Sequence, residues 1–85
     1  MRTANKDDLI LVAGAGGVVG GHLVRSLLGQ GFNRVRGVDI KPLGEWLQTF
    51  PQADNRRLDL SGMGACLEAC EGVAYVFNLA SDMGG

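Results

Sequence analysis

The sequence predicts an α/β fold in which crossover helices join the strands of a parallel sheet. Short apolar runs alternate with stretches of helical periodicity along all 85 residues. The first run is apolar without interruption, as is typical of a strand buried on both faces, and a cluster of glycines follows it directly. Because parallel strands need a crossover connection, this alternation indicates a parallel sheet with right-handed crossovers. A chain of this length forms one domain at most.

The first strand and the first helix lie on either side of the glycine cluster. Residues 9–13 (Leu-Ile-Leu-Val-Ala) form the continuous apolar run. Residues 18–30 are predicted to form a helix, because apolar side chains recur there at helical spacing and glycines follow, as they often do at helix ends. The apolar positions are Val19, Leu23, Leu27 and Leu28, and the glycines are Gly29 and Gly31.

The second strand is predicted over residues 35–38, with Asp39 directly after it. Pro42 breaks the pattern beyond this strand, since proline lacks the N–H that a helix or sheet interior needs. Residues 45–50 are then predicted to form a short helix, with Trp46 as its hydrophobic anchor.

A third strand is predicted around residues 57–58, ending at Asp59, and a last strand over residues 73–79, where β-branched and aromatic residues gather. Between these strands, Ser61 is predicted to cap a helix over residues 62–70. The apolar face of this helix is predicted to be one stripe of residues at helical spacing. Its members are Met63, Cys66, Leu67 and Cys70.

Four strands are fewer than a sheet of this kind normally holds. Doubly wound sheets that bind dinucleotides use about six strands from two halves. We therefore interpret residues 1–8 as an N-terminal tail and residues 9–85 as the N-terminal half of such a domain, and we expect it to be part of a longer protein.

Composition excludes several classes of function. A net charge of −1 provides no excess of Lys and Arg for a phosphate backbone, so nucleic acid is not an expected partner. No apolar window approaches the ~18 residues of a membrane span, and residues 1–8 lack the apolar core of a secretory signal. Cys66 and Cys70 lie on one helical face without a Cys or His cluster, so we expect reduced thiols, a cytoplasmic location and no metal site.

The glycine cluster has the frame G-x-x-G-x-x-G on Gly14, Gly17 and Gly20. The first glycine permits the tight turn out of the strand, the second lets the backbone approach a pyrophosphate, and the third lets the helix pack closely on the strand. The positive end of the helix dipole then faces the phosphates. No Lys-Ser/Thr pair follows, which disfavours a triphosphate P-loop. The alternative is a glycine turn that merely links strand and helix.

Asp39 supports the dinucleotide interpretation. It lies 19 residues after Gly20, at the end of the second strand, where an acid can accept hydrogen bonds from the adenosine ribose. An ionised carboxylate would repel the 2′-phosphate of NADP, so NAD is the expected cofactor and NADP is less favoured. Arg36 and Lys41 are near in sequence and could soften this repulsion. The alternative is a solvated acid at a strand end.

Together with Asp59-Leu60 and Asn78-Leu79-Ala80, the glycine turn and Asp39 resemble the extended short-chain dehydrogenase/reductase family, whose members include nucleotide-sugar epimerases and dehydratases. The resemblance covers residues 9–85 and implies a Rossmann-type fold that binds NAD. Residues 76–85 are especially similar to the members that epimerise GDP-mannose, which implies a GDP-mannose-like nucleotide sugar as substrate. The resemblance also implies a homodimer of the full-length protein.

The resemblance implies a role for each matching position. The glycines would hold the pyrophosphate, Asp39 would bind the ribose, and Asp59 and Leu60 would border the adenine. The alternatives are that Asp59 belongs to the start of the next helix and that Ala80 belongs to ordinary packing at a strand end. Gly84 and Gly85 would border the sugar nucleotide. The candidate cofactor-binding residues are Gly14, Gly16, Gly17, Val18, Val19, Gly20, Asp39, Ile40, Asp59, Leu60, Asn78, Leu79 and Ala80.

The catalytic pair of the family, Tyr-x-x-x-Lys, is not in this sequence. Tyr75 is followed four residues later by Leu79, so it is expected to pack in a strand. The expected function is therefore the NAD-binding segment of a nucleotide-sugar epimerase or dehydratase, with its catalytic residues farther along the longer protein. The alternatives are an NAD(P)-sensing module without catalysis and a simple NAD-dependent reductase or dehydrogenase.

Overall fold

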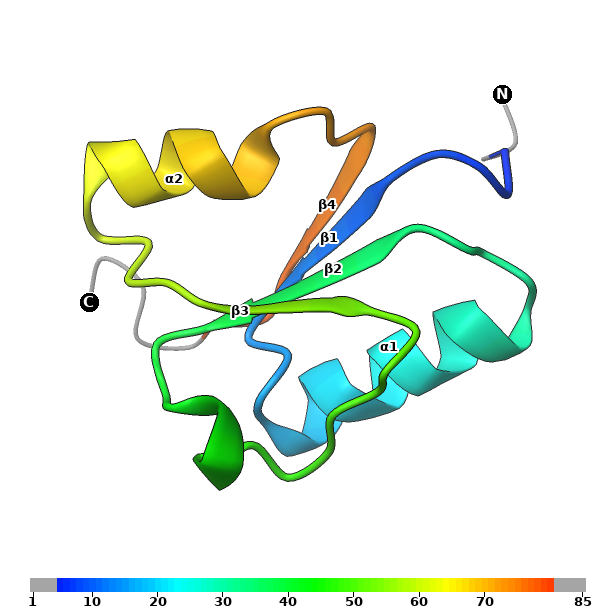
Figure 1. Ribbon diagram of the computed structural model, residues 1–85, viewed down its shortest axis with the longest axis horizontal. Coiled ribbons are helices and arrows are strands. Elements are labelled where there is room, and N and C mark those ends of the chain that lie inside the picture. Colours follow the sequence, from blue (N-terminus) through cyan, green and yellow to red (C-terminus); the bar gives the residue numbers. More distant parts are fainter. Residues whose placement is uncertain (1–4, 81–85) are drawn as a thin grey trace.

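The computed structural model describes residues 5–80, which fold into a four-stranded parallel sheet with a helix on each side (Figure 1). The predicted alternation of strands and helices is confirmed. The elements in chain order are β1 (Ile10–Ala13), α1 (Val18–Gly29), β2 (Val35–Asp39), the 3₁₀ turn η1 (Leu43–Glu45), β3 (Asp54–Arg57), α2 (Met63–Cys70) and β4 (Tyr75–Asn78).

The strand order in the sheet is β3-β2-β1-β4, and every neighbouring pair is parallel. Ile10 of the central strand β1 pairs with Val35 on one side and with Tyr75 on the other. The chain therefore adds strands on one side of β1 and then crosses to the other side. In open parallel sheets, the crevice for a ligand forms at the carboxyl ends of the strands where this reversal occurs.

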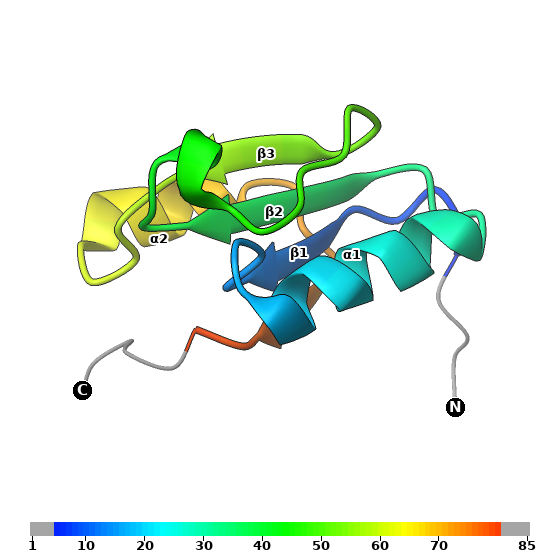
Figure 2. The ribbon, with the colours of Figure 1, turned by 90° about the horizontal axis from the view of Figure 1, so that it is seen from below.

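The helix α1 covers one face of the sheet, as Figure 2 shows. It contributes Val24 and Leu27 to a core cluster that also holds Ile10 and Val12 of β1. Val19 was predicted to lie on the buried face, but it is 66% exposed. The next residue, Gly20, is buried instead, because α1 packs there against the glycine turn.

The helix α2 lies on the opposite face, where only Ala69 among its residues is fully buried. The predicted apolar stripe is wrong, because Met63 and Leu67 are exposed. Ser61 is also not the helix cap: the cap position is Gly62 without a side-chain hydrogen bond, and the Ser61 hydroxyl donates to Asp59 instead. Ala69 packs in a second buried cluster with Leu11 and Val38 on this face.

The segment after β2 differs from its prediction. The expected helix over residues 45–50 is absent, and a single 3₁₀ turn forms earlier, at Leu43–Glu45. Trp46 has an extended backbone (φ −68°, ψ 140°) and its side chain is buried in the core that α1 covers. The chain leaves the helical conformation at this residue, and the indole Nε1–H donates to the Lys41 carbonyl oxygen at 2.9 Å. The predicted role of Trp46 as an anchor holds for the loop rather than for a helix.

The third strand, β3, begins three residues earlier than predicted, at Asp54, and ends at Arg57 rather than at Asp59. Its sequence is Asp-Asn-Arg-Arg, which offers no apolar pattern. Among the described residues it is an edge strand that pairs only with β2, and edge strands tolerate charged residues on both faces. The last strand, β4, is shorter than its prediction and occupies the other edge of the described sheet.

Arg36 joins the sheet to α2. Its side chain points from β2 to the α2 side of the sheet and the residue is only 8% exposed. The guanidinium donates to the carbonyl oxygens of Ala69 (2.8 Å) and Glu71 (3.0 Å) at the end of α2, and to the Asp54 carboxylate (3.1 Å). A cation at the C-terminal end of α2 also stabilises the helix by interacting with the negative end of its dipole.

Within residues 5–80, neither helix has the length and apolarity that crossing a membrane would require.

Candidate functional site

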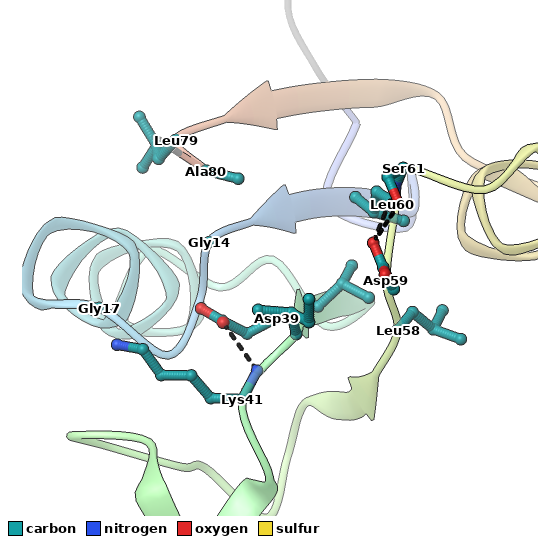
Figure 3. Close-up of a pocket in the computed structure, with 12 residues that line it drawn as sticks. Gly14, Gly17, Asp39, Lys41, Leu58, Asp59, Leu60, Ser61, Leu79 and Ala80 are labelled. Carbon is teal, nitrogen blue, oxygen red and sulfur yellow. Dashed lines mark hydrogen bonds between the residues drawn. The ribbon is translucent and has the colours of Figure 1, made fainter. Parts of the chain in front are cut away.

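A pocket of about 260 Å³ opens at the carboxyl ends of all four strands (Figure 3). It lies at the edge of the sheet where the strand order reverses, the position at which open parallel sheets bind their ligands. Segments far apart in the sequence meet here only because parallel strands end at the same edge. The lining residues are Gly14, Gly17, Val38, Asp39, Ile40, Lys41, Leu58, Asp59, Leu60, Ser61, Leu79 and Ala80.

Two glycines shape the turn between β1 and α1. Gly14 has φ +90°, a conformation that L side chains rarely adopt, and a Cβ there would also lie 2.8 Å from the Leu79 carbonyl carbon. A Cβ at Gly20 would collide with the carbonyl oxygen of Gly14. Gly14 thus makes the tight turn out of β1, and Gly20 lets α1 pack closely on the turn that follows this strand.

Gly17 leaves open space at the start of α1. A Cβ on this residue would meet only the Gly14 carbonyl oxygen, at 3.6 Å, and its backbone is extended. The helix that follows has no side-chain cap and no acidic residue in its first turn. The Gly17 N–H donates to the Gly14 carbonyl oxygen at 3.1 Å, so the N–H groups of the residues after it and the positive dipole end are what remains for an anion beside the pocket.

The Asp39 carboxylate connects the end of β2 with the glycine turn. Its Oδ2 accepts a hydrogen bond from the Gly16 N–H at 2.9 Å, and its Oδ1 accepts one from the Lys41 N–H at 3.1 Å. Gly16 does not line the pocket, and its N–H is directed to Asp39 rather than to a ligand. Each carboxylate oxygen keeps a further lone pair for hydroxyl donors.

Asp59 forms a local turn with Ser61. The Asp59 Oδ1 accepts hydrogen bonds from the Ser61 hydroxyl at 2.7 Å and from the Ser61 N–H at 3.0 Å. These two bonds, the hydroxyl first, lower the pKa of Asp59 below its ordinary value, so the carboxylate is ionised at neutral pH. Leu58 and Leu60 flank it and provide the apolar wall of the pocket.

The end of β4 closes the remaining side of the pocket. The Leu79 N–H donates to the Ala13 carbonyl oxygen at 2.8 Å, which continues the pairing of β4 with β1. Asn78 does not line the pocket: its Oδ1 accepts a hydrogen bond from the Ala80 N–H at 3.3 Å. Leu79 and Ala80 therefore reach the pocket, and Asn78 supports the turn behind them.

The structure brings most of the predicted residues together. Val18 and Val19 are exposed at the start of α1, and with Gly16, Gly20 and Asn78 they stand outside the pocket lining. Gly84 and Gly85 lie outside the described residues. The predicted residues that line the pocket are Gly14, Gly17, Asp39, Ile40, Asp59, Leu60, Leu79 and Ala80.

Sequence reasoning did not select Val38, Leu58, Lys41 or Ser61 as site residues, although each of them lines the pocket. The signal that could have found them is their position. Val38 and Leu58 directly precede the two acids of the site, and Lys41 and Ser61 follow these acids by two residues. Residues on both sides of an acid at a strand end lie at the same edge of the sheet as the acid.

Tyr75 is not part of the pocket. It lies in β4 and packs against the core cluster under α1, as the sequence predicts for a structural strand residue. Within residues 5–80, no three His, Cys, Asp or Glu side chains are grouped in a way that could hold a metal ion.

Comparison with known proteins connects this pocket to a chemistry. The profile of the NAD dependent epimerase/dehydratase family matches residues 10–85. Among curated proteins, GDP-mannose 3,5-epimerase 1 of Oryza sativa subsp. japonica is 37% identical over 76 residues, and GDP-mannose 3,5-epimerase of Arabidopsis thaliana is 38% identical over 76 residues. Each match covers 89% of this chain and 20% of the relative, so the chain spans about a fifth of the length of these enzymes.

Two solved structures from Agrobacterium tumefaciens share the fold. A short-chain dehydrogenase/reductase superfamily protein with bound NAD matches with a TM-score of 0.71 and 33% identity, over 88% of this chain and 21% of that protein. A uronate dehydrogenase mutant complexed with NAD matches with a TM-score of 0.67 and 25% identity, over 85% of this chain and 26% of that protein.

Proposed function

Since the chain belongs to the NAD dependent epimerase/dehydratase family, we propose that its pocket binds NAD for a nucleotide-sugar epimerase or dehydratase reaction. The observation that carries the proposal is the meeting of Gly17, Asp39 and Asp59 at one pocket. These residues lie in the segments that follow β1, β2 and β3, and they combine an open anion site with two acids. The NAD bound by two structural relatives supports the same cofactor.

Each part of the pocket suits one part of the dinucleotide. The open space at Gly17 and the N-terminus of α1 would hold the pyrophosphate. The carboxylate of Asp39 would accept the ribose hydroxyls. Leu58 and Leu60 would pack on the adenine, and the ionised Asp59 would accept a hydrogen bond from its exocyclic amine.

The charge of Asp39 favours NAD over NADP. A carboxylate at the ribose would face the 2′-phosphate of NADP with like charge, which weakens NADP binding. The exposed side chain of Lys41 extends toward Gly17 in Figure 3 and provides a positive charge at the same end of the sheet. The proposed preference for NAD thus requires that the 2′-position of the ribose lies nearer to the Asp39 carboxylate than to the Lys41 ammonium group.

The role of this chain in the reaction is to bind and orient the cofactor. NAD held in this pocket would supply reversible hydride transfer with a sugar carbon, and the transient ketone would acidify the neighbouring C–H bonds. The similarity to two GDP-mannose 3,5-epimerases supports a GDP-sugar as the substrate of the whole protein. We further propose that the whole protein is a cytoplasmic homodimer that supplies the proton-transferring residues from outside residues 5–80.

Calorimetric titration of the chain with NAD tests this function. We expect heat of binding with the unaltered chain and at least about a tenfold loss of affinity in Gly17→Val, because the added side chain fills the phosphate space without disturbing an extended backbone. Gly29→Val is the matched control, since a Cβ at Gly29 has no neighbour within 4 Å and the residue is at the other end of α1.

Two results would contradict the proposal. One is the absence of heat with both NAD and NADH in the unaltered, folded chain. The other is an affinity for NAD that Gly17→Val and Gly29→Val lower equally, because the pocket would then not be where the phosphates bind.

A further inference from the structure

Trp46 lies directly behind the pocket without lining it. The residue is 7% exposed and packs in the core that α1 covers. A Cβ at Gly16 would be 3.0 Å from the Trp46 Cδ1 atom, and one at Gly37 would be 3.6 Å from its Cζ3 atom. The indole therefore occupies the space that two glycines leave free, one in the glycine turn and one in β2.

Four hydrogen bonds form a closed ring through this tryptophan. The Trp46 Nε1–H donates to the Lys41 carbonyl oxygen at 2.9 Å, and the Lys41 N–H donates to the Asp39 Oδ1 at 3.1 Å, the bond drawn in Figure 3. The Gly16 N–H donates to the Asp39 Oδ2 at 2.9 Å. The Gly16 carbonyl oxygen accepts from the N–H of Leu47, the residue after Trp46, at 3.1 Å, which closes the ring.

The ring fixes the orientation of the Asp39 carboxylate. One amide donor holds each of its two oxygens, and the donors belong to two different segments of the chain. A rotation about the side-chain bonds of Asp39 would break both bonds at once. The remaining lone pairs of the carboxylate consequently keep one direction relative to the pocket.

We propose that Trp46 is a positioning residue that sets the preference of this pocket for NAD over NADP by holding the Asp39 carboxylate through the hydrogen-bonded ring. The inference rests on the proposed binding of NAD. A fixed carboxylate accepts the two ribose hydroxyls of NAD without rearrangement. The 2′-phosphate of NADP is repelled by the same carboxylate, because its fixed orientation keeps the negative charge directed at the phosphate.

Positive groups beside the ring explain why its loss would favour NADP. Lys41 lines the pocket, and the Arg57 Nε–H donates to the Ile40 carbonyl oxygen at 3.0 Å. Both cations belong to the ends of β2 and β3, next to Asp39. If the carboxylate is released from its amide donors and rotates, the 2′-phosphate encounters these cations instead of the acid.

Binding of NAD and NADP to the Trp46→Phe variant tests the inference. Phenylalanine keeps an aromatic ring in the space beside Gly16 but has no N–H for the Lys41 carbonyl. We expect the ratio of NAD to NADP affinity to narrow by roughly three- to tenfold, the effect of losing one hydrogen bond. Asp39→Ala, which removes the charge itself, is expected to narrow the ratio further.

A purely structural role of Trp46 would give a different result, because a loosened fold weakens both cofactors by the same factor and leaves their ratio unchanged. Phe50→Leu is the matched control: Phe50 packs against the same core cluster but is not in the ring. The ratio of NAD to NADP affinity in Phe50→Leu should equal that of the unaltered chain. An unchanged ratio in Trp46→Phe would overturn the inference.

A second measurement needs no substitution, in case Trp46→Phe does not fold. The chain has one tryptophan, so its indole N–H gives one resonance in a spectrum of the ¹⁵N-labelled protein. Saturating NAD should shift this resonance and slow its exchange with water, and NADP should do so less. If NAD binds and neither quantity changes, the inference fails and the proposed function stands. If neither dinucleotide binds to the unaltered chain, both fail.

Discussion

Single residues at the strand ends set the electrostatics of the pocket, and Asp59 shows how locally this is done. Its carboxylate is fully exposed, and its two hydrogen bonds come from one residue, Ser61, two positions along the chain. The Ser61 hydroxyl is the larger cause of the lowered pKa of Asp59. The lowered pKa of this acid therefore depends on the local sequence Asp-x-Ser more than on the fold.

Replacing Ser61 by alanine should raise the pKa of Asp59 toward the ordinary aspartate value of about 3.9, because the hydroxyl that stabilises the charged form is removed. An NMR titration of the Asp59 carboxyl carbon measures this change. Ser26→Ala is the control, since the Ser26 hydroxyl bonds Gln30 on α1. An unchanged pKa in Ser61→Ala would show that the hydroxyl bond is not formed in solution.

The lowered pKa of Asp59 also determines how the stability of the fold changes with pH. A carboxylate whose pKa is lower in the folded state stabilises the fold above the unfolded pKa, near about pH 4. This contribution is lost as the pH falls through the lowered pKa of the folded chain. Ser61→Ala should therefore reduce the difference between the Tm at neutral pH and the Tm in acid.

At the scale of elements, Arg36 decides how α2 sits on the sheet. Few side chains of α2 are buried, so packing alone holds this helix weakly. The guanidinium of Arg36 supplies hydrogen bonds to two carbonyl oxygens at the helix end and joins them to Asp54 of β3. One residue of β2 thereby connects α2 with an edge strand.

Arg36→Met should lower the free energy of unfolding by about 2 kcal/mol, because two carbonyl oxygens at the end of α2 lose a charged donor while the apolar volume is retained. Urea denaturation followed by circular dichroism measures it. Arg34→Met serves as the comparison, because Arg34 is exposed and its side chain, within residues 5–80, makes only a long hydrogen bond of 3.4 Å to the Asp7 carbonyl oxygen. Equal stability of the two variants would exclude the anchoring role of Arg36.

The elements that the sequence predicted well are those with a local signal. The β1 strand and the α1 helix follow from apolar periodicity and from glycines at their ends. The β3 strand was misplaced, since an Asp-Asn-Arg-Arg strand forms by pairing with β2. The helix expected over residues 45–50 does not form, and the η1 turn before it ends where Trp46 enters the core. Neither cause is visible within the segment itself.

For the molecule as a whole, β4 is the most exposed part of the described sheet. Val76 is 53% and Phe77 is 42% exposed, and within residues 5–80 the strand pairs only with β1. Its other edge presents backbone N–H and C=O groups beside apolar side chains. Such an edge is a template for pairing with another chain.

The 85-residue chain alone should therefore self-associate, and Val76→Lys should shift it toward the monomer, because a lysine on an edge strand opposes edge-to-edge pairing. Sedimentation equilibrium over a range of concentrations measures the association. Leu43→Lys adds the same charge to an exposed apolar residue in η1 and should leave the association unchanged. A chain that stays monomeric and melts cooperatively would contradict this expectation.

By itself the sequence determined that this protein is a parallel α/β fold with a glycine turn between its first strand and helix, because periodicity and a positive φ at Gly14 are encoded within a few residues. Only the tertiary structure decided that Asp39 holds the Gly16 amide, 23 residues away, and that Trp46 stands behind both. Such contacts depend on which strands become neighbours and on how closely their glycines let the chain approach. The local sequence pattern determines neither the neighbouring strands nor the distance of this approach.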